Sequence, residues 1–144
     1  MTFNAKLFDA LSNRELYEIF KSRLAVFMLE QNIICQDLDD VDYKALHCFF
    51  DKDGKIVAYL RAYMSEDNSS VQIGRVLTVR RGEGIGKKLM CESEKKIKEI
   101  FNCKAFLLHA QTQAQGFYEK CGYSVISQEF MEEGVPHVTM IKNI

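Results

Sequence analysis

The sequence predicts an α/β domain in which helices flank a mixed β-sheet. Two observations indicate this class: segments rich in β-branched and aromatic residues alternate with amphipathic segments, and the strands are connected both by a tight turn and by helices. This order fits neither a doubly wound Rossmann fold nor a helical bundle. The 144 residues are assigned to one domain, since a chain of this size buries roughly 68–70% of its unfolded surface without further staples.

The N-terminal segment predicts a strand, a helix and an acidic loop. Residues 3–8 alternate between apolar and polar and predict the first strand. Ser12 and Glu15 have the spacing of a capping box. Apolar side chains then recur with helical spacing at Leu16, Ile19, Phe20, Leu24 and Phe27. Residues 28–44 are acidic with a weak period, which predicts a loop with room for one short helix.

Three strands follow. Residues 45–51 and 56–63 are rich in β-formers, and the Asp53-Gly54 pair between them is a strong hairpin signal. A polar turn then precedes a third strand at 71–79, which continues into a glycine-rich turn.

The C-terminal half alternates between helices and strands. Residues 85–101 carry an apolar stripe opposite a charged face and predict a long helix. A strand at 104–110 precedes a short helix at 113–120, which Gly122 can end in a left-handed cap. Strands at 123–127 and 138–141 are expected to complete the sheet.

Composition excludes several classes of function. The net charge of −1 argues against a general nucleic-acid or anionic-membrane binder, and no apolar run reaches the roughly 20 residues of a membrane span. The first residues show no export signal. The five cysteines contain no Cys-x-x-Cys pair, so we expect reduced thiols, no metal site and a cytoplasmic location.

The turn from Arg81 to Gly86 has three glycines between a strand and a helix. Glycine permits a sharp turn and close approach to a ligand, and the free N–H groups of the helix start suit a phosphate. The spacing fits neither a P-loop nor a dinucleotide fingerprint, but it does fit Arg-x-x-Gly-x-Gly. These six residues alone leave open both a phosphate site and an ordinary tight turn.

This pattern resembles the acetyl-coenzyme A signature of the GNAT (GCN5-related N-acetyltransferase) superfamily, and the segment 117–123 is similar to its Tyr-x-x-x-Gly-aromatic motif. Segments 23–31, 73–76 and 133–137 resemble the ElaA-like subfamily, so the resemblance covers nearly the whole chain. Two features depart from the family pattern: the stretch from Arg75 to Gly82 is short, and Gln111 stands where many members have asparagine.

The resemblance implies the GNAT fold and acetyl-CoA as co-substrate, without a metal. The third strand is expected to separate from strand 104–110, with the pantetheine arm in the gap. Main-chain groups of Val76, Leu77 and Val79 would bind this arm. The remaining expected cofactor-binding residues are Arg81, Gly82, Gly84, Ile85, Gly86, Lys87, Gln111 and Phe117.

In such enzymes a neutral amine attacks the thioester directly, and coenzyme A leaves as a thiolate. The resemblance makes Tyr118 the general acid, since a phenol of pKa near 10 stays protonated at neutral pH. The alternative is a core tyrosine with a bonded hydroxyl. The identity of the base stays open among His109, His47, His137, Glu30 acting through water, and bulk water; His109, which ends the strand beside the gap, is placed at the catalytic centre.

The acceptor is expected to be a primary amine of a small molecule or peptide. Its expected contacts are Glu30, Gln31, Arg75, His47 and His137. Two questions stay open here. The acidic stretch 28–44 either attracts a cationic amine or is a solvated face. Arg75 either points into the cleft or points away from it and forms an ion pair. A second class of function is a non-catalytic acyl-CoA sensor or assembly module, although such a binder would not need the Tyr118 segment. An exposed C-terminal strand could also form a homodimer.

Overall fold

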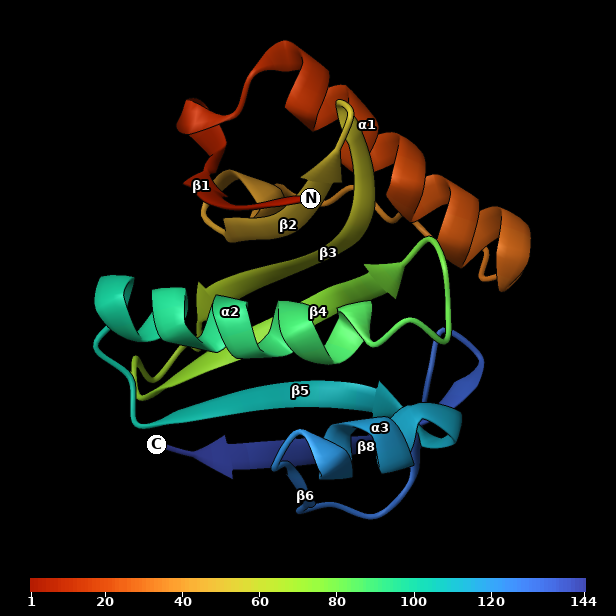
Figure 1. Cartoon of the computed structure of the whole chain (residues 1–144). Coiled ribbons are helices and arrows are strands. Elements are labelled where there is room, and N and C mark those ends of the chain that lie inside the picture. The colour runs from red at the N-terminus through yellow and green to blue at the C-terminus, as the bar shows by residue number, and fades with distance from the viewer.

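The computed structural model describes all 144 residues and contains an eight-stranded sheet flanked by helices on both faces (Figure 1). The strand order is β1-β2-β3-β4-β5-β8-β6, and β7 also pairs with β8. Every pairing is antiparallel except β4 with β5. The predicted α/β class with a mixed sheet is therefore confirmed.

The strands are β1 (Thr2–Leu7), β2 (Leu46–Lys52), β3 (Lys55–Met64), β4 (Ser70–Thr78), β5 (Ala105–Gln111), β6 (Ser124–Val125), β7 (Phe130–Glu132) and β8 (Val135–Asn143). The α-helices are α1 (Asn13–Arg23), α2 (Ile85–Ile100) and α3 (Gln115–Lys120). Shorter 3-10 turns are η1 (Phe8–Ala10), η3 (Asp40–Tyr43) and η4 (Thr112–Ala114), and η2 (Leu24–Glu30) is a π-helix. No helix has the length and apolar character needed to cross a bilayer.

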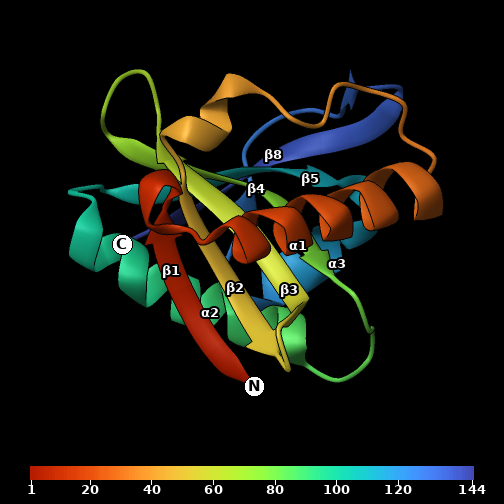
Figure 2. The ribbon, with the colours of Figure 1, turned by 90° about the horizontal axis from the view of Figure 1, so that it is seen from above.

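The two faces of the sheet have separate cores because neighbouring residues of a strand point to opposite sides. Cys48 and Phe50 of β2 pack in the larger core with residues of α2 and α3. Phe49 lies between them in the sequence and packs in the smaller core with Ile19 of α1. Figure 2 accordingly shows α1 and α2 on opposite sides of the strands.

Local sequence signals are confirmed. The Ser12 hydroxyl accepts the Glu15 N–H at 3.0 Å, and the Glu15 carboxylate accepts the Ser12 N–H at 2.8 Å, which completes the capping box. Asp53 and Gly54 have positive φ angles of 55° and 78° in the β2–β3 turn. The expected loop start at residue 28 is wrong, because η2 continues the helix to Glu30. The short helix expected within 28–44 is η3.

The C-terminal strands differ from the prediction. Only Ser124 and Val125 of the segment 123–127 form a strand, whereas β8 is longer than expected and β7 was not predicted. Pro136 lacks an N–H, so the sequence around it reads as a break. The expected exposed C-terminal edge is also wrong, because β8 pairs with β5 on one side and with β6 and β7 on the other.

The pairing between β4 and β5 ends half-way along the strands. Residues Ser70–Ile73 pair with Ala105–Leu108, and no pairing follows. Beyond this point β4 has a register shift against β3, and Arg75 adopts a positive φ of 53°. The two strands are close at the left of Figure 1 and separate towards the right. The gap expected from the resemblance is therefore present.

Candidate active site

A cleft of about 1200 Å³ opens where β4 and β5 separate. Its walls come from the end of η2 and the following loop, β4, the glycine turn, β5, α3 and the β7–β8 turn. Most of the predicted site residues line it: Gln31, Arg75, Val76, Leu77, Arg81, Gly82, Gly84, Ile85, Gly86, Lys87, His109, Gln111, Phe117, Tyr118 and His137. Glu30 lines a smaller adjoining hollow. His47 and Val79 do not line the cleft, and Val79 is 52% exposed.

The glycine turn presents free backbone amides to the cleft. Gly82 and Gly84 have φ angles of 83° and 72°, and no atom lies within 4 Å of the position that a Cβ would take at either glycine. Gly84 precedes the first turn of α2, where no side chain caps the helix. The first N–H groups of a helix have no intrahelical partner, so this end of α2 is suited to an anion.

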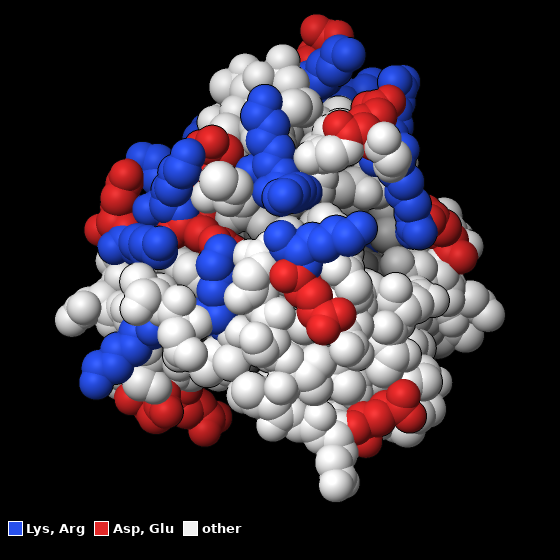
Figure 3. All heavy atoms as spheres, turned by 60° about the horizontal axis from the view of Figure 1, so that its bottom comes forward, with Lys and Arg blue, Asp and Glu red and all other residues white.

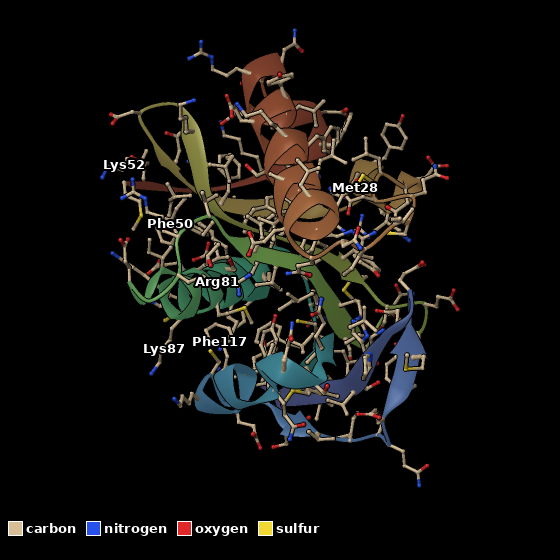
Figure 4. The ribbon with its side chains drawn as sticks, turned by 90° about the vertical axis from the view of Figure 1, so that its right-hand side faces the viewer. Met28, Phe50, Lys52, Arg81, Lys87 and Phe117 are labelled. Atoms are coloured by element: carbon tan, nitrogen blue, oxygen red, sulfur yellow. The ribbon has the colours of Figure 1, made fainter.

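Side chains around the turn complete this end of the cleft. Figure 4 shows Arg81 and Phe117 near the start of α2, with Lys87 extending towards solvent. A Cβ on Gly86 would lie 3.2 Å from Cζ of Phe117, so any larger residue here would require the Phe117 ring to shift by a few tenths of an ångström. Lysine and arginine side chains gather over the upper half of the face in Figure 3, which includes α2. Such a gathering of positive charge favours the approach of anionic groups.

Tyr118 lies in α3 with its ring in the larger core. Its ring packs edge-on against Phe117 at 5.1 Å and against Tyr123 at 6.1 Å. Burial raises the pKa of the Tyr118 hydroxyl, which has no hydrogen-bond partner in the protein. By contrast, the Tyr123 hydroxyl donates to Glu94 at 2.8 Å. The Tyr118 hydroxyl therefore makes no hydrogen bond to another protein group, and its role as the general acid stays a prediction.

The three histidines have very different surroundings. His47 is fully buried, its Nδ1 accepts from the Tyr59 hydroxyl at 2.7 Å, and its Nε2 donates to the Asp42 carbonyl at 2.9 Å. Burial lowers the pKa of His47. Both ring nitrogens are thus occupied within the protein, so the predicted contact between His47 and the acceptor does not agree with its position.

His109 and His137 both approach Glu132, which lies on the unpredicted strand β7. His109 Nδ1 is 2.9 Å from Glu132 Oε1, and His137 Nε2 is 3.6 Å from Glu132 Oε2. His137 Nδ1 donates to the Val135 carbonyl at 2.7 Å. Sequence reasoning missed Glu132, because the only signal was an acidic pair before Gly134 and the strand itself was not recognised.

Arg75 both lines the cleft and forms an ion pair, so each of its two alternatives holds in part. Its Nε lies 2.8 Å from Asp37 Oδ1. Asp37 Oδ2 in turn accepts from Arg23 Nε at 2.9 Å, and Arg61 donates to both oxygens of Asp39 at 2.6 and 3.0 Å. The hydrogen bond from Arg61 holds the pKa of Asp39 below its usual range.

These contacts correct the interpretation of the acidic stretch 28–44. Asp37 and Asp42 are buried, and arginines from α1, β3 and β4 neutralise them together with Asp39. These carboxylates are therefore neither a solvated face nor a free attractor for a cationic amine. They fix the loop after η2 to the sheet as one wall of the cleft.

Two further contacts cross the mouth of the cleft. Arg81 donates to Glu30 Oε1 at 2.6 Å, although both side chains are at least half exposed. Gln111 Nε2 donates to Gln31 Oε1 at 3.0 Å. The end of η2 is therefore joined to the glycine turn and to β5.

The family model described as acetyltransferase (GNAT) domain matches residues 9–144. The chain belongs to the GNAT acetyltransferase family. This GNAT protein is 36% identical to a UPF0039 protein of Schizosaccharomyces pombe over 97% of its own chain and 95% of that relative. It is 34% identical to ElaA of Escherichia coli over 93% of its chain and 91% of ElaA. The predicted ElaA-like membership is thus confirmed.

Solved structures agree with this assignment. The crystal structure of Escherichia coli ElaA has a TM-score of 0.92 at 31% identity, covering 99% of this chain and all of the other (100%). An acyl-CoA N-acyltransferase from Pseudomonas aeruginosa has a TM-score of 0.91 at 27% identity, covering 99% of both chains. An aminoglycoside 6′-N-acetyltransferase complexed with coenzyme A shares the fold, with a TM-score of 0.72 at 13% identity over 97% of this chain and 96% of that one.

Proposed function

We propose that this GNAT protein transfers the acetyl group of acetyl-CoA to a primary amine of a small molecule or peptide. The observation that carries the proposal is that one cleft is lined both by the glycine turn, where no side chain caps α2, and by Tyr118, whose hydroxyl has no hydrogen-bond partner in the protein. A protein that only bound acyl-CoA would need the amides but not the hydroxyl. This favours an enzyme over a sensor or assembly module.

The cofactor would lie along the gap between β4 and β5. Backbone N–H groups of residues 81–87 would bind the diphosphate at the start of α2. Main-chain groups of Val76 and Leu77, which line the cleft, would bind the pantetheine arm, and an N–H there would polarise the thioester carbonyl. The fold neighbour complexed with coenzyme A supports this use of the fold.

Acetyl transfer would then need one base and one acid. His109 would remove the proton of the acceptor ammonium, and the neutral amine would attack the carbonyl carbon. As the tetrahedral intermediate collapses, the C–S bond breaks and Tyr118 protonates the departing thiolate. The acceptor nitrogen then loses one of its two remaining protons, which returns through solvent to the Tyr118 oxygen. Overall, the reaction releases the one proton that His109 removed from the ammonium. Burial, which raises the pKa of Tyr118, keeps the phenol protonated for this step.

The test combines binding and turnover. Acetyl-CoA binding is measured by isothermal titration calorimetry, and thiol release is followed across a panel of primary amines. Tyr118→Phe should lower kcat by roughly 10²-fold or more while the Kd for acetyl-CoA changes little. Tyr17→Phe is the control, because Tyr17 is 65% exposed on α1. Binding without turnover on any amine would favour the sensor, and unchanged turnover in Tyr118→Phe would remove Tyr118 from the mechanism.

A further inference from the structure

The cluster of Glu132 with His109 and His137 lies at the end of the cleft away from the glycine turn, and it joins three strands. His109 comes from β5, Glu132 from β7 and His137 from β8. All three residues line the cleft. The ring of Phe130 packs edge-on against His109 at 5.2 Å and stacks with His137 at 6.1 Å.

The contact between His109 and Glu132 determines which ring nitrogen of His109 carries the proton. A carboxylate is only an acceptor, so at the 2.9 Å contact the hydrogen must be on His109 Nδ1. A neutral imidazole has one N–H, and Nε2 therefore keeps a free lone pair. No protein group occupies this nitrogen, and the His109 side chain is 40% exposed.

His109 also stands at the point where the sheet opens. Leu108 is the last residue of β5 paired with β4, so His109 is the first residue beyond the pairing. Leu108 and Ala110 point into the core under α2 and α3, where Tyr118 also packs. Because side chains alternate along a strand, His109 projects from the opposite face of the sheet. The proposed acid and base thus approach the gap from opposite faces.

His137 cannot take the same role. It is only 7% exposed, its Nδ1 is bound to the Val135 carbonyl, and its Nε2 faces Glu132. It instead lies beside the second oxygen of the carboxylate. Glu133 lies beside Glu132, and the opposite wall carries Arg75 and Arg61, whose charges are paired with Asp37 and Asp39.

We propose that Glu132 is a positioning residue that holds His109 in the Nδ1–H tautomer, with the Nε2 lone pair directed at the acceptor amine. This inference rests on the proposed function. In the step it supports, an N–H bond of the ammonium breaks and the proton forms a bond with His109 Nε2. The resulting imidazolium keeps its Nδ1–H bond to Glu132, whose negative charge stabilises it, and later releases the proton to water.

The first test reads the tautomer directly and needs no acceptor. Two-dimensional ¹H–¹⁵N spectra of the histidine rings are recorded on the full chain at about pH 8.5, well above the ordinary histidine pKa of about 6.5, and His109→Gln identifies the His109 signals. We expect the Nδ1–H form in the wild type and in Glu133→Ala, a matched control at an exposed neighbour. We expect a shift towards Nε2–H in Glu132→Ala. An Nε2–H form in the wild type, or no change in Glu132→Ala, would overturn the proposal.

The second test separates positioning from a merely structural role. The most active primary alkylamine of the panel is compared at about pH 8.5 with the hydrazine of the same carbon skeleton, which is largely neutral at this pH and needs no base to deprotonate it before attack. Glu132→Ala and His109→Gln should lower kcat/KM by roughly 10²-fold for the alkylamine and only a few-fold for the hydrazine, with the Kd for acetyl-CoA unchanged. Equal losses on both acceptors would overturn the proposal. If no amine is acetylated, the proposed function fails while the tautomer result still decides the placement of His109 by Glu132.

Discussion

Replacement of Arg23 by leucine should destabilise the protein severely. Arg23 is 0% exposed and donates to Asp37 Oδ2 at 2.9 Å, to the Asp37 carbonyl at 2.8 Å and to Asp42 Oδ1 at 2.7 Å. Removing one partner of a buried ion pair costs about 3–5 kcal/mol. The lower end applies here because Arg75 and Arg61 still pair with the two aspartates.

A loss of about 3 kcal/mol is a large part of the roughly 5–15 kcal/mol that stabilises a domain. Each kcal/mol shifts the melting midpoint of a chain near this size by roughly 2–4 °C, so the midpoint should fall by roughly 6–12 °C. Urea unfolding followed by circular dichroism measures the free energy, and a thermal scan measures the midpoint. The stability of Arg23→Lys should lie between that of the wild type and that of Arg23→Leu, since lysine keeps the charge but lacks the planar guanidinium group.

Arg14→Leu is the control, because Arg14 is an exposed arginine of the same helix and forms no ion pair. Its free energy of unfolding should stay within about 0.5 kcal/mol of the wild type. If Arg23→Leu also remained within about 1 kcal/mol of the wild type, the buried network would not be the support of this wall of the cleft, and the reasoning from a desolvated ion pair would be refuted.

Three other outcomes are expected. Burial lowers the pKa of His47, so as the pH falls the unfolded chain binds a proton at this histidine at a higher pH than the folded protein does. The free energy of unfolding should therefore decrease as the pH falls below about 6.5. The free energy of unfolding, measured by urea unfolding between about pH 5 and 8, should depend less steeply on pH in His47→Asn than in the wild type. An equal pH dependence in the two proteins would contradict the prediction. Gly84→Ala, at a φ of 72°, should cost about 1–2 kcal/mol of stability and weaken acetyl-CoA binding in calorimetry, whereas Gly116→Ala should not; equal affinities would count against the amide site. Glu30→Gln frees Arg81 and should tighten acetyl-CoA binding by about two-fold, the scale of an exposed ion pair, while weaker binding would argue against a phosphate contact by Arg81.

Features set by short sequence segments could be predicted from the sequence. The capping box at Ser12 depends on residues three positions apart, and the Asp53-Gly54 turn depends on two residues that tolerate positive φ. The spacing of glycines from 82 to 86 similarly indicated an open helix start, and the structure has it. Such signals need no knowledge of what packs against them.

Features set by distant contacts could not be predicted in the same way. Charged side chains are mostly exposed, so the acidic stretch suggested a surface loop, whereas three arginines from different elements bury two of its aspartates. The meeting of His109 and His137 depends on the register of β8 against β5, which pairs Gln111 with His137. The place of Glu132 also depends on β7, a three-residue strand with little pattern of its own.

The short parallel pairing between β4 and β5 affects how tightly a ligand can bind in the gap. Past Ile73 and Leu108 the facing main-chain groups of the two strands have no partners across the gap, and buried backbone groups without protein partners must be hydrated. A ligand that enters the gap therefore exchanges ordered water for its own amides, and its affinity reflects the difference between the two sets of hydrogen bonds. A ligand of equal length and polarity without correctly spaced amides would displace the same water but form no hydrogen bonds to replace those that are lost.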